Sequence, residues 1–281
     1  MLSYRHAFHA GNHADVLKHC LLVALLRHLN QKDKPWWYVD SHAGAGLYDL
    51  DSDYARKNAE YDTGITRLWQ RTDAPPLVAD YLDQVRALNR EGRLRLYPGS
   101  PWLASRLMRQ DDQLRLFELH GTDAEALRQV FSEQPRHIKV VAGDGLAGLK
   151  SVLPPQPRRG LVLIDPSYEI KDDYRRVVSA LKEALDRFAT GTYAVWYPCL
   201  ARAEARDLQD RLKRLPVAAW LHTRLDVQTP SPDGIGMHGS GMFIINPPWR
   251  LAEALRTELP WLVEALGQDA GAGHLLEHQA R

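Results

Sequence analysis

The sequence predicts an α/β protein with a doubly wound, mostly parallel sheet. Short apolar runs rich in aromatic and β-branched residues recur along the 281-residue chain as candidate strands. Segments with apolar residues at three- and four-residue spacing, the pattern of an amphipathic helix, separate most of these runs. Such alternation is typical of a parallel sheet with helices on both faces. The seven candidate strands are residues 36–39, 114–119, 137–141, 161–164, 193–197, 221–227 and 242–245.

The connection between the first two strands and the connection between the last two differ from the regular alternation of strands and helices. More than 70 residues separate the first two strands, whereas a parallel crossover needs only a dozen or more. We therefore expect a small helical subdomain, inserted after the first strand, over residues 48–98. Residues 229–241 hold four glycines and two prolines without a helical period, so the last two strands should form an antiparallel hairpin at one edge. Helical patterns cover residues 15–29, 58–69, 77–88, 101–108, 124–131, 174–188 and 202–215.

These expectations divide the chain into four parts. Residues 1–47 hold an N-terminal arm, a helix and the first strand, and residues 48–98 form the helical insertion. Residues 99–266 complete the main domain. Residues 267–281, with three glycines among polar side chains, are expected to be a flexible tail.

Composition is that of an ordinary globular protein. Hydrophobic residues make up 44% of the chain, and its longest apolar stretch, residues 21–26, is far shorter than the roughly 20 residues of a membrane span. Without a signal segment, we expect the protein in the cytoplasm. Cys20 and Cys199 fit neither a disulfide framework nor metal-ligand spacing and should be buried thiols. The net charge is only +1, so any nucleic-acid site must be a local patch.

Three successive strand ends carry residues suited to binding a nucleoside. Asp40 is followed by Gly44 and Gly46, and glycine lets the backbone approach a ligand closely. Glu118 ends the second strand, where an acidic side chain of a doubly wound fold accepts hydrogen bonds from ribose hydroxyls. Asp144, which follows the third strand, could accept a hydrogen bond from an adenine amine. Each feature alone also fits a simple turn, a solvated carboxylate or a helix N-cap, but together they favour a nucleoside site.

The fourth strand leads into the sharpest motif, Asp165-Pro166-Ser167-Tyr168. It resembles the Asp-Pro-Pro-Tyr signature of enzymes that methylate the N6 amine of adenine. That amine is a poor nucleophile because its lone pair is delocalised into the ring. Hydrogen bonds from its two hydrogens to the Asp165 carboxylate and the Pro166 carbonyl would direct the lone pair at a methyl donor, and Tyr168 would stack on the base. Ser167 replaces the second proline, but neither hydrogen bond uses that side chain.

A second match to this pattern, Asn246-Pro247-Pro248-Trp249, follows the seventh strand. If that strand is antiparallel, its end lies at the opposite edge of the sheet from the Gly44 turn. The fourth strand, by contrast, usually borders the first at the crevice where such folds bind ligands. We therefore place catalysis at Asp165 and not at Asn246.

The N-terminal segment is dense in aromatic, basic and histidine residues. Histidine is a common metal ligand, but recognised metal-site spacing is lacking, so no metal is expected. A histidine-rich surface would explain the same composition. The preferred interpretation is an arm that covers the cofactor and touches RNA, with Tyr4 stacking on a base and His6 and Lys18 meeting phosphate or base.

Taken together, six segments closely resemble the RlmJ family of bacterial 23S ribosomal RNA adenine-N6 methyltransferases, in the right order and over nearly the whole chain. The resemblance implies the seven-stranded methyltransferase form of the Rossmann-like fold, with six parallel strands and the last antiparallel. It also implies S-adenosylmethionine as methyl donor and a monomeric enzyme that acts on 23S rRNA before full ribosome assembly. The segments are residues 1–6, 9–19, 40–46, 97–101, 164–168 and 241–249.

Carried over residue by residue, the family implies a catalytic Asp165, with Tyr4, His6 and Lys18 near the RNA. The implied cofactor contacts, with Gly44 of the first turn added, are His19, His42, Gly44, Ser100, Glu118, Asp144, Gly145 and Asp165. Two alternatives stay open. One is methylation of adenine in DNA, because the Asp165 motif reads the base and not the sugar; the other is a nucleic-acid-binding protein without turnover, because fold alone does not establish function.

Overall fold

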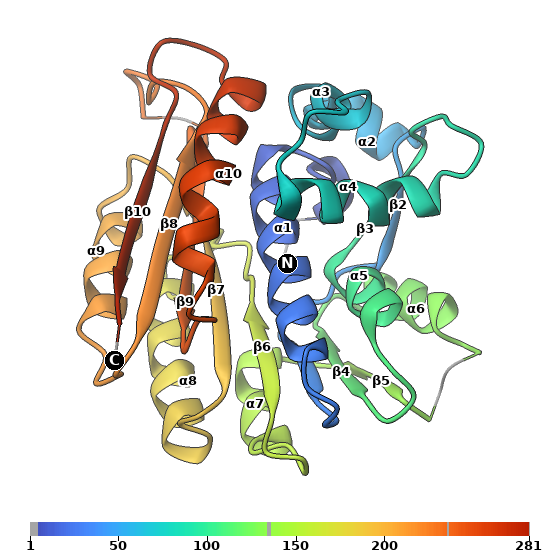
Figure 1. The fold of residues 1–281 in the computed structure, drawn as a ribbon, viewed down its shortest axis with the longest axis vertical. Helices are drawn as coiled ribbons and strands as arrows, with labels where there is room; N and C mark the ends of the chain where they lie inside the picture. The colour runs from blue at the N-terminus through green and yellow to red at the C-terminus, as the bar shows by residue number, and fades with distance from the viewer. Residues whose placement is uncertain (1–4, 134–135, 235, 281) are drawn as a thin grey trace.

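An eight-stranded sheet with helices on both faces forms the framework of the chain (Figure 1), in a computed structural model that describes residues 5–133, 136–234 and 236–280. Its strands are β1 (Trp37–Asp40), β4 (Gln113–Glu118), β5 (Ile138–Ala142), β6 (Gly160–Ile164), β7 (Thr192–Cys199), β8 (Trp220–Asp226), β9 (Gly239–Ile245) and β10 (Gly273–Gln279). They lie in the order β10-β8-β9-β7-β6-β1-β4-β5. Strands β5, β4, β1, β6 and β7 are parallel, and β9 is antiparallel to both β7 and β8. The predicted fold class is confirmed, with an eighth strand added.

Two hydrophobic layers flank the sheet, because side chains of its central strands alternate between the faces. Leu161 and Leu163 of β6 pack in one layer, and Val162 and Ile164 pack in the other. This two-sided burial explains why β6 reads as a continuous apolar run. Helices α1 (His13–Asn30), α5 (Ser100–Leu107), α6 (Gly121–Val130) and α10 (Leu251–Leu266) cover the first layer, and α7 (Gly145–Val152), α8 (Asp173–Arg187) and α9 (Ala203–Lys213) cover the second.

The insertion after β1 is helical, as predicted. A two-stranded antiparallel ladder of β2 (Leu47–Asp49) and β3 (Leu96–Pro98) closes its base, and it holds α2 (Asp53–Asn58), the 3-10 helix η2 (Glu60–Thr63), α3 (Ile65–Trp69) and α4 (Pro76–Leu88). The single helix expected over residues 58–69 is wrong. Gly64 interrupts it, because the backbone there packs so closely on Gly11 that a Cβ would lie 2.1 Å from the Gly11 carbonyl oxygen.

The expectation of a flexible tail is also wrong. Residues 273–279 form β10, which pairs antiparallel with the whole of β8 and packs beside α10. The physical reason is the free edge of β8, whose unpaired backbone groups accept another strand. Asp269 closes the preceding turn by accepting hydrogen bonds from the backbone N–H groups of Thr229 and Gly271, at 2.9 and 2.8 Å.

Helix α10 is a further element that the sequence analysis did not identify. Its apolar side chains recur with helical spacing, but Pro260 lies within it. The Glu258 carboxylate accepts hydrogen bonds from the N–H groups of Leu77 and Val78, at the start of α4, and so joins α10 to the insertion. Among the helices of the described residues, none has the length and apolar character needed to cross a bilayer.

Candidate active site

A cavity, here called the first cavity, lies at the carboxyl ends of β1, β4 and β6. The chain runs from β1 outward to β4 and β5 on one side and continues from β6 on the other, so this is the point where doubly wound sheets bind ligands. All residues predicted to contact the cofactor line this cavity. They come from segments that are far apart in the sequence, and the fold brings them together. They are His19, His42, Gly44, Ser100, Glu118, Asp144, Gly145 and Asp165.

Two glycines shape the backbone around this cavity. Gly44 has a φ of +61°, and a Cβ there would lie 2.2 Å from the Tyr48 hydroxyl oxygen. At Gly145 a Cβ would lie 2.0 Å from the Ser41 carbonyl oxygen. Any other residue at position 145 would push the loop after β1 away from the start of α7, and one at position 44 would push the Tyr48 side chain aside. Gly145 therefore keeps two strand-end loops in close contact along the cavity wall.

Glu118 is held by backbone donors at the end of β4. One carboxylate oxygen accepts a hydrogen bond from the Gly44 N–H and the other from the His120 N–H, each at 2.7 Å. Burial raises the pKa of Glu118, while these two hydrogen bonds act in the opposite direction. Its carboxylate is thus fixed beside the glycine loop with lone pairs left over for hydroxyl donors.

Asp144 both caps a helix and lines the first cavity. Its Oδ1 accepts a hydrogen bond from the Ala147 N–H at 3.2 Å and caps helix α7, while its Oδ2 pairs with the Arg176 guanidinium. Arg176 also lines the first cavity. Its role as a helix cap is therefore compatible with a role in the site.

A buried aspartate behind the cavity wall holds two of the lining residues in place. Asp40 accepts hydrogen bonds from the Ser100 hydroxyl at 2.7 Å, the Tyr38 hydroxyl at 2.6 Å and the His42 N–H at 3.1 Å. Sequence reasoning placed Asp40 in the first turn but assigned it no role. Its position as the last residue of β1, followed by a glycine turn, was the signal that it lies close to the site.

Two histidines of the cavity are kept neutral by burial. Burial lowers the pKa of His19 to about 3 and that of His42 to about 4. His19 Nδ1 shares a hydrogen bond with the Tyr97 hydroxyl at 2.9 Å, while its Nε2 is buried without a hydrogen-bond partner among the described residues. His42 Nδ1 shares one with the Ser41 hydroxyl at 2.8 Å. Neutral rings suit a site for a cationic cofactor.

Asp165 lies at the centre of a buried charge network. Its Oδ2 is 2.6 Å from the Lys18 ammonium nitrogen, and the same nitrogen lies 2.8 Å from Asp15 Oδ1. Burial raises the pKa of Asp165 to about 6, although the charge and hydrogen bond of Lys18 lower it. Asp15, one turn before Lys18 on α1, was not predicted as a site residue, because a carboxylate near a helix start more often serves the helix dipole.

Of the N-terminal residues predicted to meet RNA, Lys18 has surroundings that differ from the prediction. Lys18 is buried, and its two carboxylate partners hold the ammonium inside the protein, so it does not present itself to phosphate. His6 lines the first cavity, where its Nε2 lies 2.9 Å from Asp15 Oδ2. Tyr4 lies outside the described residues.

The base-stacking role predicted for Tyr168 is contradicted by its position. The side chain is 1% exposed, its ring packs on Tyr174, and its hydroxyl donates to the Trp196 carbonyl oxygen at 2.8 Å. The φ of +53° at this residue turns it away from the cavity into the protein. Tyr168 therefore anchors the loop that carries Asp165 and Pro166, both of which line the first cavity.

A second cavity adjoins the first at Asp165. Its floor includes Trp196 of β7, and its walls come from the start of α1, from Glu60 of the insertion and from the loop before β9. His13 lines it with Nδ1 buried and without a hydrogen-bond partner among the described residues. The residues shared by both cavities are His6, Lys18, Asp165 and Ser167.

The competing Asn246 motif lies elsewhere, as predicted. Because β9 is antiparallel, Asn246 comes at the opposite edge of the sheet, where its side-chain amide donates to the carbonyl oxygens of Ala189 and Gly191, both at 2.8 Å. It lines neither the first nor the second cavity. Both cysteines are buried, also as predicted.

Comparison with known proteins agrees with this geometry. Residues 33–277 match the family model described as "Ribosomal RNA large subunit methyltransferase D, RlmJ". The chain belongs to this family. Proteins named "Ribosomal RNA large subunit methyltransferase J" are 48% identical in Escherichia coli, over 98% of this chain and 97% of the relative, and 46% identical in Haemophilus influenzae, over 95% and 94%. The crystal structure of protein LPL1258 from Legionella pneumophila superposes with a TM-score of 0.89 at 34% identity, over 97% of this chain and 99% of that one.

Family membership makes the chain a methyltransferase with S-adenosylmethionine as its methyl donor. The residues of the first cavity fit that cofactor. Glu118 could offer its carboxylate to ribose hydroxyls, and Asp144 lies at the adjoining strand end, where an adenine amine could reach it. Among the described residues, the buried His19 Nε2 has no hydrogen-bond partner and is 4.0 Å from Asp15 Oδ1.

Proposed function

We propose that this RlmJ-family chain transfers the methyl group of S-adenosylmethionine to the exocyclic N6 amine of an adenine in 23S ribosomal RNA. The position of Asp165 at the junction of the two cavities is the observation that carries this proposal. The first cavity fits the cofactor, and the second has room on the other side of Asp165 for a base. The names of the curated relatives support ribosomal RNA of the large subunit as the substrate.

The chemistry follows from the groups around Asp165. The cofactor supplies an electrophilic methyl group on a sulfonium. The carboxylate of Asp165 and the carbonyl of Pro166 accept hydrogen bonds from the two N6 hydrogens, which directs the nitrogen lone pair toward that methyl group. After transfer, the nitrogen carries one proton too many. The Asp165 carboxylate, with its pKa raised to about 6, is a better acceptor for this proton than an ordinary aspartate.

The depth of the site bears on the form of the RNA. The Asp165 side chain is only 12% exposed, so the target base must leave its stack to reach it. Such a base is easier to extract from RNA that is not yet packed into a ribosome, which supports action before full assembly. The substrate also implies the cytoplasm as the place of action.

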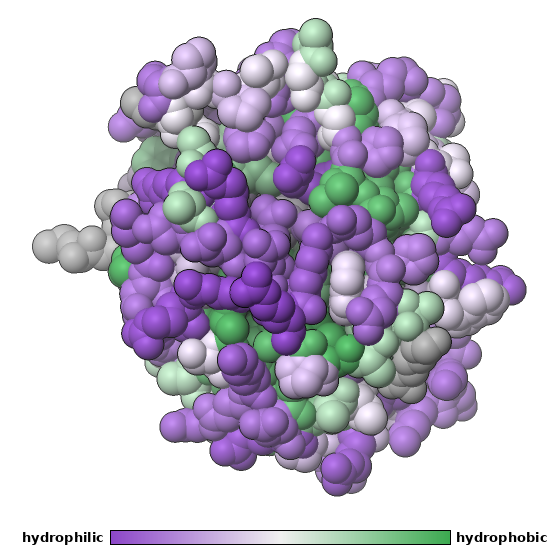
Figure 2. All heavy atoms as spheres, turned by 90° about the vertical axis from the view of Figure 1, so that its left-hand side faces the viewer, coloured by the Kyte–Doolittle hydropathy of each residue, from purple (hydrophilic) through white to green (hydrophobic). Residues whose placement is uncertain are grey.

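We expect the enzyme to act as a monomer, as the resemblance to the family implies. Figure 2 shows the side of the molecule on the left of Figure 1, where β10 and α9 lie, and hydrophilic residues separate the apolar patches on it. Light scattering of the purified protein, with and without RNA, tests whether the protein is monomeric.

The test of the proposal compares substrates and variants. Purified protein is incubated with S-adenosylmethionine and unmodified 23S rRNA or adenine-containing DNA, and N6-methyladenine is measured by mass spectrometry. We expect product from RNA with the wild type and none with Asp165→Asn. Asn246→Gly is the matched control, because it alters the competing motif at the other edge and should leave activity intact. Preference for DNA, or cofactor binding without product on any RNA, would replace the proposal with one of the two alternatives.

A further inference from the structure

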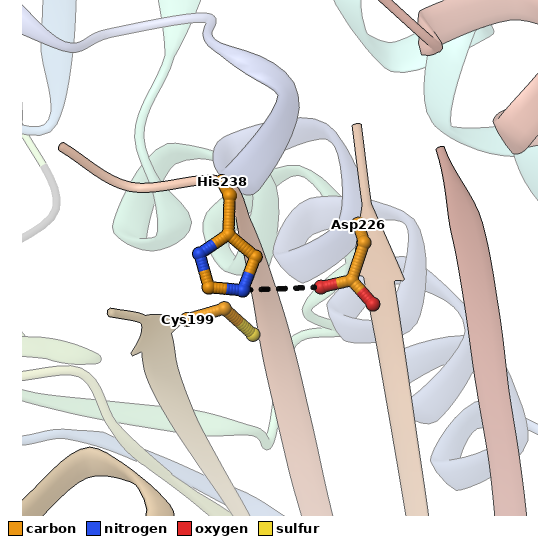
Figure 3. Close-up of side chains that lie close together, drawn as sticks. All are labelled: Cys199, Asp226 and His238. Carbon is orange, nitrogen blue, oxygen red and sulfur yellow. Dashed lines mark ion pairs between the residues drawn. The ribbon is translucent and has the colours of Figure 1, made fainter. Parts of the chain in front are cut away.

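Three potential metal ligands converge at the ends of neighbouring strands, outside the residues that line the two cavities. Cys199 ends β7, Asp226 ends β8, and His238 directly precedes β9. Strand pairing sets both Cys199 and Asp226 opposite Gly239, the residue after His238. Figure 3 shows the three side chains lying close together across these strands.

The distances match those between the ligands of one metal ion. The Cys199 sulfur, an Asp226 carboxylate oxygen and a His238 ring nitrogen all lie within 4.8 Å of one another. His238 Nε2 is 3.7 Å from Asp226 Oδ1. Around a tetrahedral zinc ion with bonds of about 2.0–2.3 Å, ligand atoms lie about 3.4–3.6 Å apart. The His238–Asp226 distance already matches this spacing, and movements of about 1 Å or less would bring the Cys199 sulfur into it.

The Asp226 carboxylate has one oxygen available for such an ion. Oδ2 accepts a hydrogen bond from Arg224 Nε at 2.8 Å, whereas Oδ1 is buried and faces His238 Nε2 at 3.7 Å, and the carboxylate also interacts with the Cys199 thiol. A buried carboxylate oxygen without a strong hydrogen-bond donor is costly, and a bound cation would satisfy it. Gly239 keeps the space around it open, because a Cβ there would lie 2.7 Å from Oδ1.

We propose that Cys199, Asp226 and His238 bind a zinc ion. Thiolate, imidazole and carboxylate together are a donor set suited to Zn²⁺, and water would take the fourth position. On binding, the Cys199 thiol releases its proton to solvent and its sulfur bonds to the metal. The charges of the ion, the thiolate and the carboxylate then sum to zero, which suits a site in which Cys199 is 4% exposed.

The ion would clamp the loop between β8 and β9 to the end of β7. This loop supplies Gln228, Gly236 and Met237 to the wall of the second cavity. The ligands are far apart in the sequence and meet only through strand pairing, so the expectation of no metal site rested on spacing alone. The proposal replaces that expectation and does not depend on which polymer the enzyme methylates.

Cobalt titration of the full-length, metal-stripped protein tests the site. We expect one equivalent of Co²⁺ to give the near-ultraviolet absorption of a thiolate–cobalt bond together with the visible bands of tetrahedral cobalt, and one equivalent of Zn²⁺ to abolish both. Cys199→Ala should lose the thiolate band, and His238→Ala should weaken binding at least tenfold. Cys20→Ala is the matched control, because Cys20 is the other buried thiol and lies in α1.

Zinc should also raise the melting temperature of the wild type and of Cys20→Ala, but not that of Cys199→Ala or His238→Ala. If Cys199→Ala fails to fold, His238→Ala alone decides the test, because its altered side chain is partly exposed. Absence of the thiolate band in the wild type, its persistence in Cys199→Ala, or its loss in Cys20→Ala would each overturn the proposal.

Discussion

At the scale of single residues, Asp165 depends on the ammonium that faces it. Lys18 bridges Asp165 and Asp15, so a buried carboxylate whose pKa is raised to about 6 is still ionised at neutral pH. Only the ionised form offers all its oxygen lone pairs to the N6 hydrogens. Lys18 is thus a positioning residue for Asp165.

This pairing predicts the pH dependence of methyl transfer. The single-turnover rate should fall as the pH drops through about 6, because Asp165 becomes protonated. Lys18→Met removes the charge that lowers the pKa of Asp165, so the midpoint should move to higher pH by about one unit or more. Rates measured from pH 5 to 9 at saturating cofactor check this. An unchanged midpoint in Lys18→Met would show that Asp165 does not govern the profile.

Asp165 should also lower stability at neutral pH. Its pKa is raised from 3.8 in the unfolded chain to about 6 in the fold, so its contribution is most favourable below pH 3.8 and is lost as the pH rises through 6. The loss is on the order of 3 kcal/mol. Asp165→Asn should therefore abolish activity without lowering the melting temperature at pH 7. A clearly lower melting temperature would mean that the Lys18 pairing stabilises the fold on balance.

The positions of residues could be predicted where the topology of the sheet determines them. The ends of parallel strands meet at one edge of a sheet whatever their side chains are, and three such ends carry Glu118, Asp144 and Asp165. The direction of a side chain was not predictable. Tyr168 turns inward through a positive φ, and Lys18 turns inward because Asp15 and Asp165 both attract it.

At the scale of elements, the start of α7 must lie against the loop after β1. Gly145→Ala places a Cβ 2.0 Å from the Ser41 carbonyl oxygen, so it should lower the free energy of unfolding by about 1–3 kcal/mol and weaken cofactor binding at least tenfold. Gly143→Ala is the control, since a Cβ there meets nothing within 4 Å. Calorimetry of cofactor binding and thermal melting check both variants. Equal effects of the two substitutions would contradict this account.

Strand β10 should contribute to stability. Removing residues 268–281 uncovers the backbone of β8 and deletes Glu277, which pairs with Lys213 and lies 3.0 Å from the buried ring of His222. The melting temperature should fall by several degrees, at roughly 2–4 °C per kcal/mol for a chain of this size. Glu277→Gln in the full chain separates the ion pairs from the strand itself and should cost less. Equal melting temperatures for the truncated and full chains would mean that β10 is dispensable.

Elements with a strong period were predictable, and those defined by a partner were not. The seven predicted strands and the helices between them follow from apolar patterns that packing then satisfies. Strand β10 forms because β8 has a free edge, and the helix predicted over residues 58–69 is interrupted at Gly64 because Gly11 packs against that glycine. In both cases the partner is far away in the sequence.

At the scale of the whole molecule, one chain surrounds two adjoining cavities with Asp165 between them. Strand ends of the doubly wound sheet and α1 line the first cavity, while α1, the insertion and the loop before β9 line the second. Figure 1 shows α1 alongside the insertion helix α4, next to the sheet. The added elements therefore lie on the side where a base must approach.

The most direct test of this account is the amount of N6-methyladenine formed in unmodified 23S rRNA by the wild type, Asp165→Asn and Asn246→Gly, measured by mass spectrometry of nucleosides. The account predicts one methylated adenine per RNA with the wild type and Asn246→Gly, and a rate at least a thousandfold lower with Asp165→Asn, on the order of 4 kcal/mol of transition-state stabilisation. Methylation by Asp165→Asn at the wild-type rate, or its loss in Asn246→Gly alone, would place the chemistry at the other edge of the sheet and contradict it.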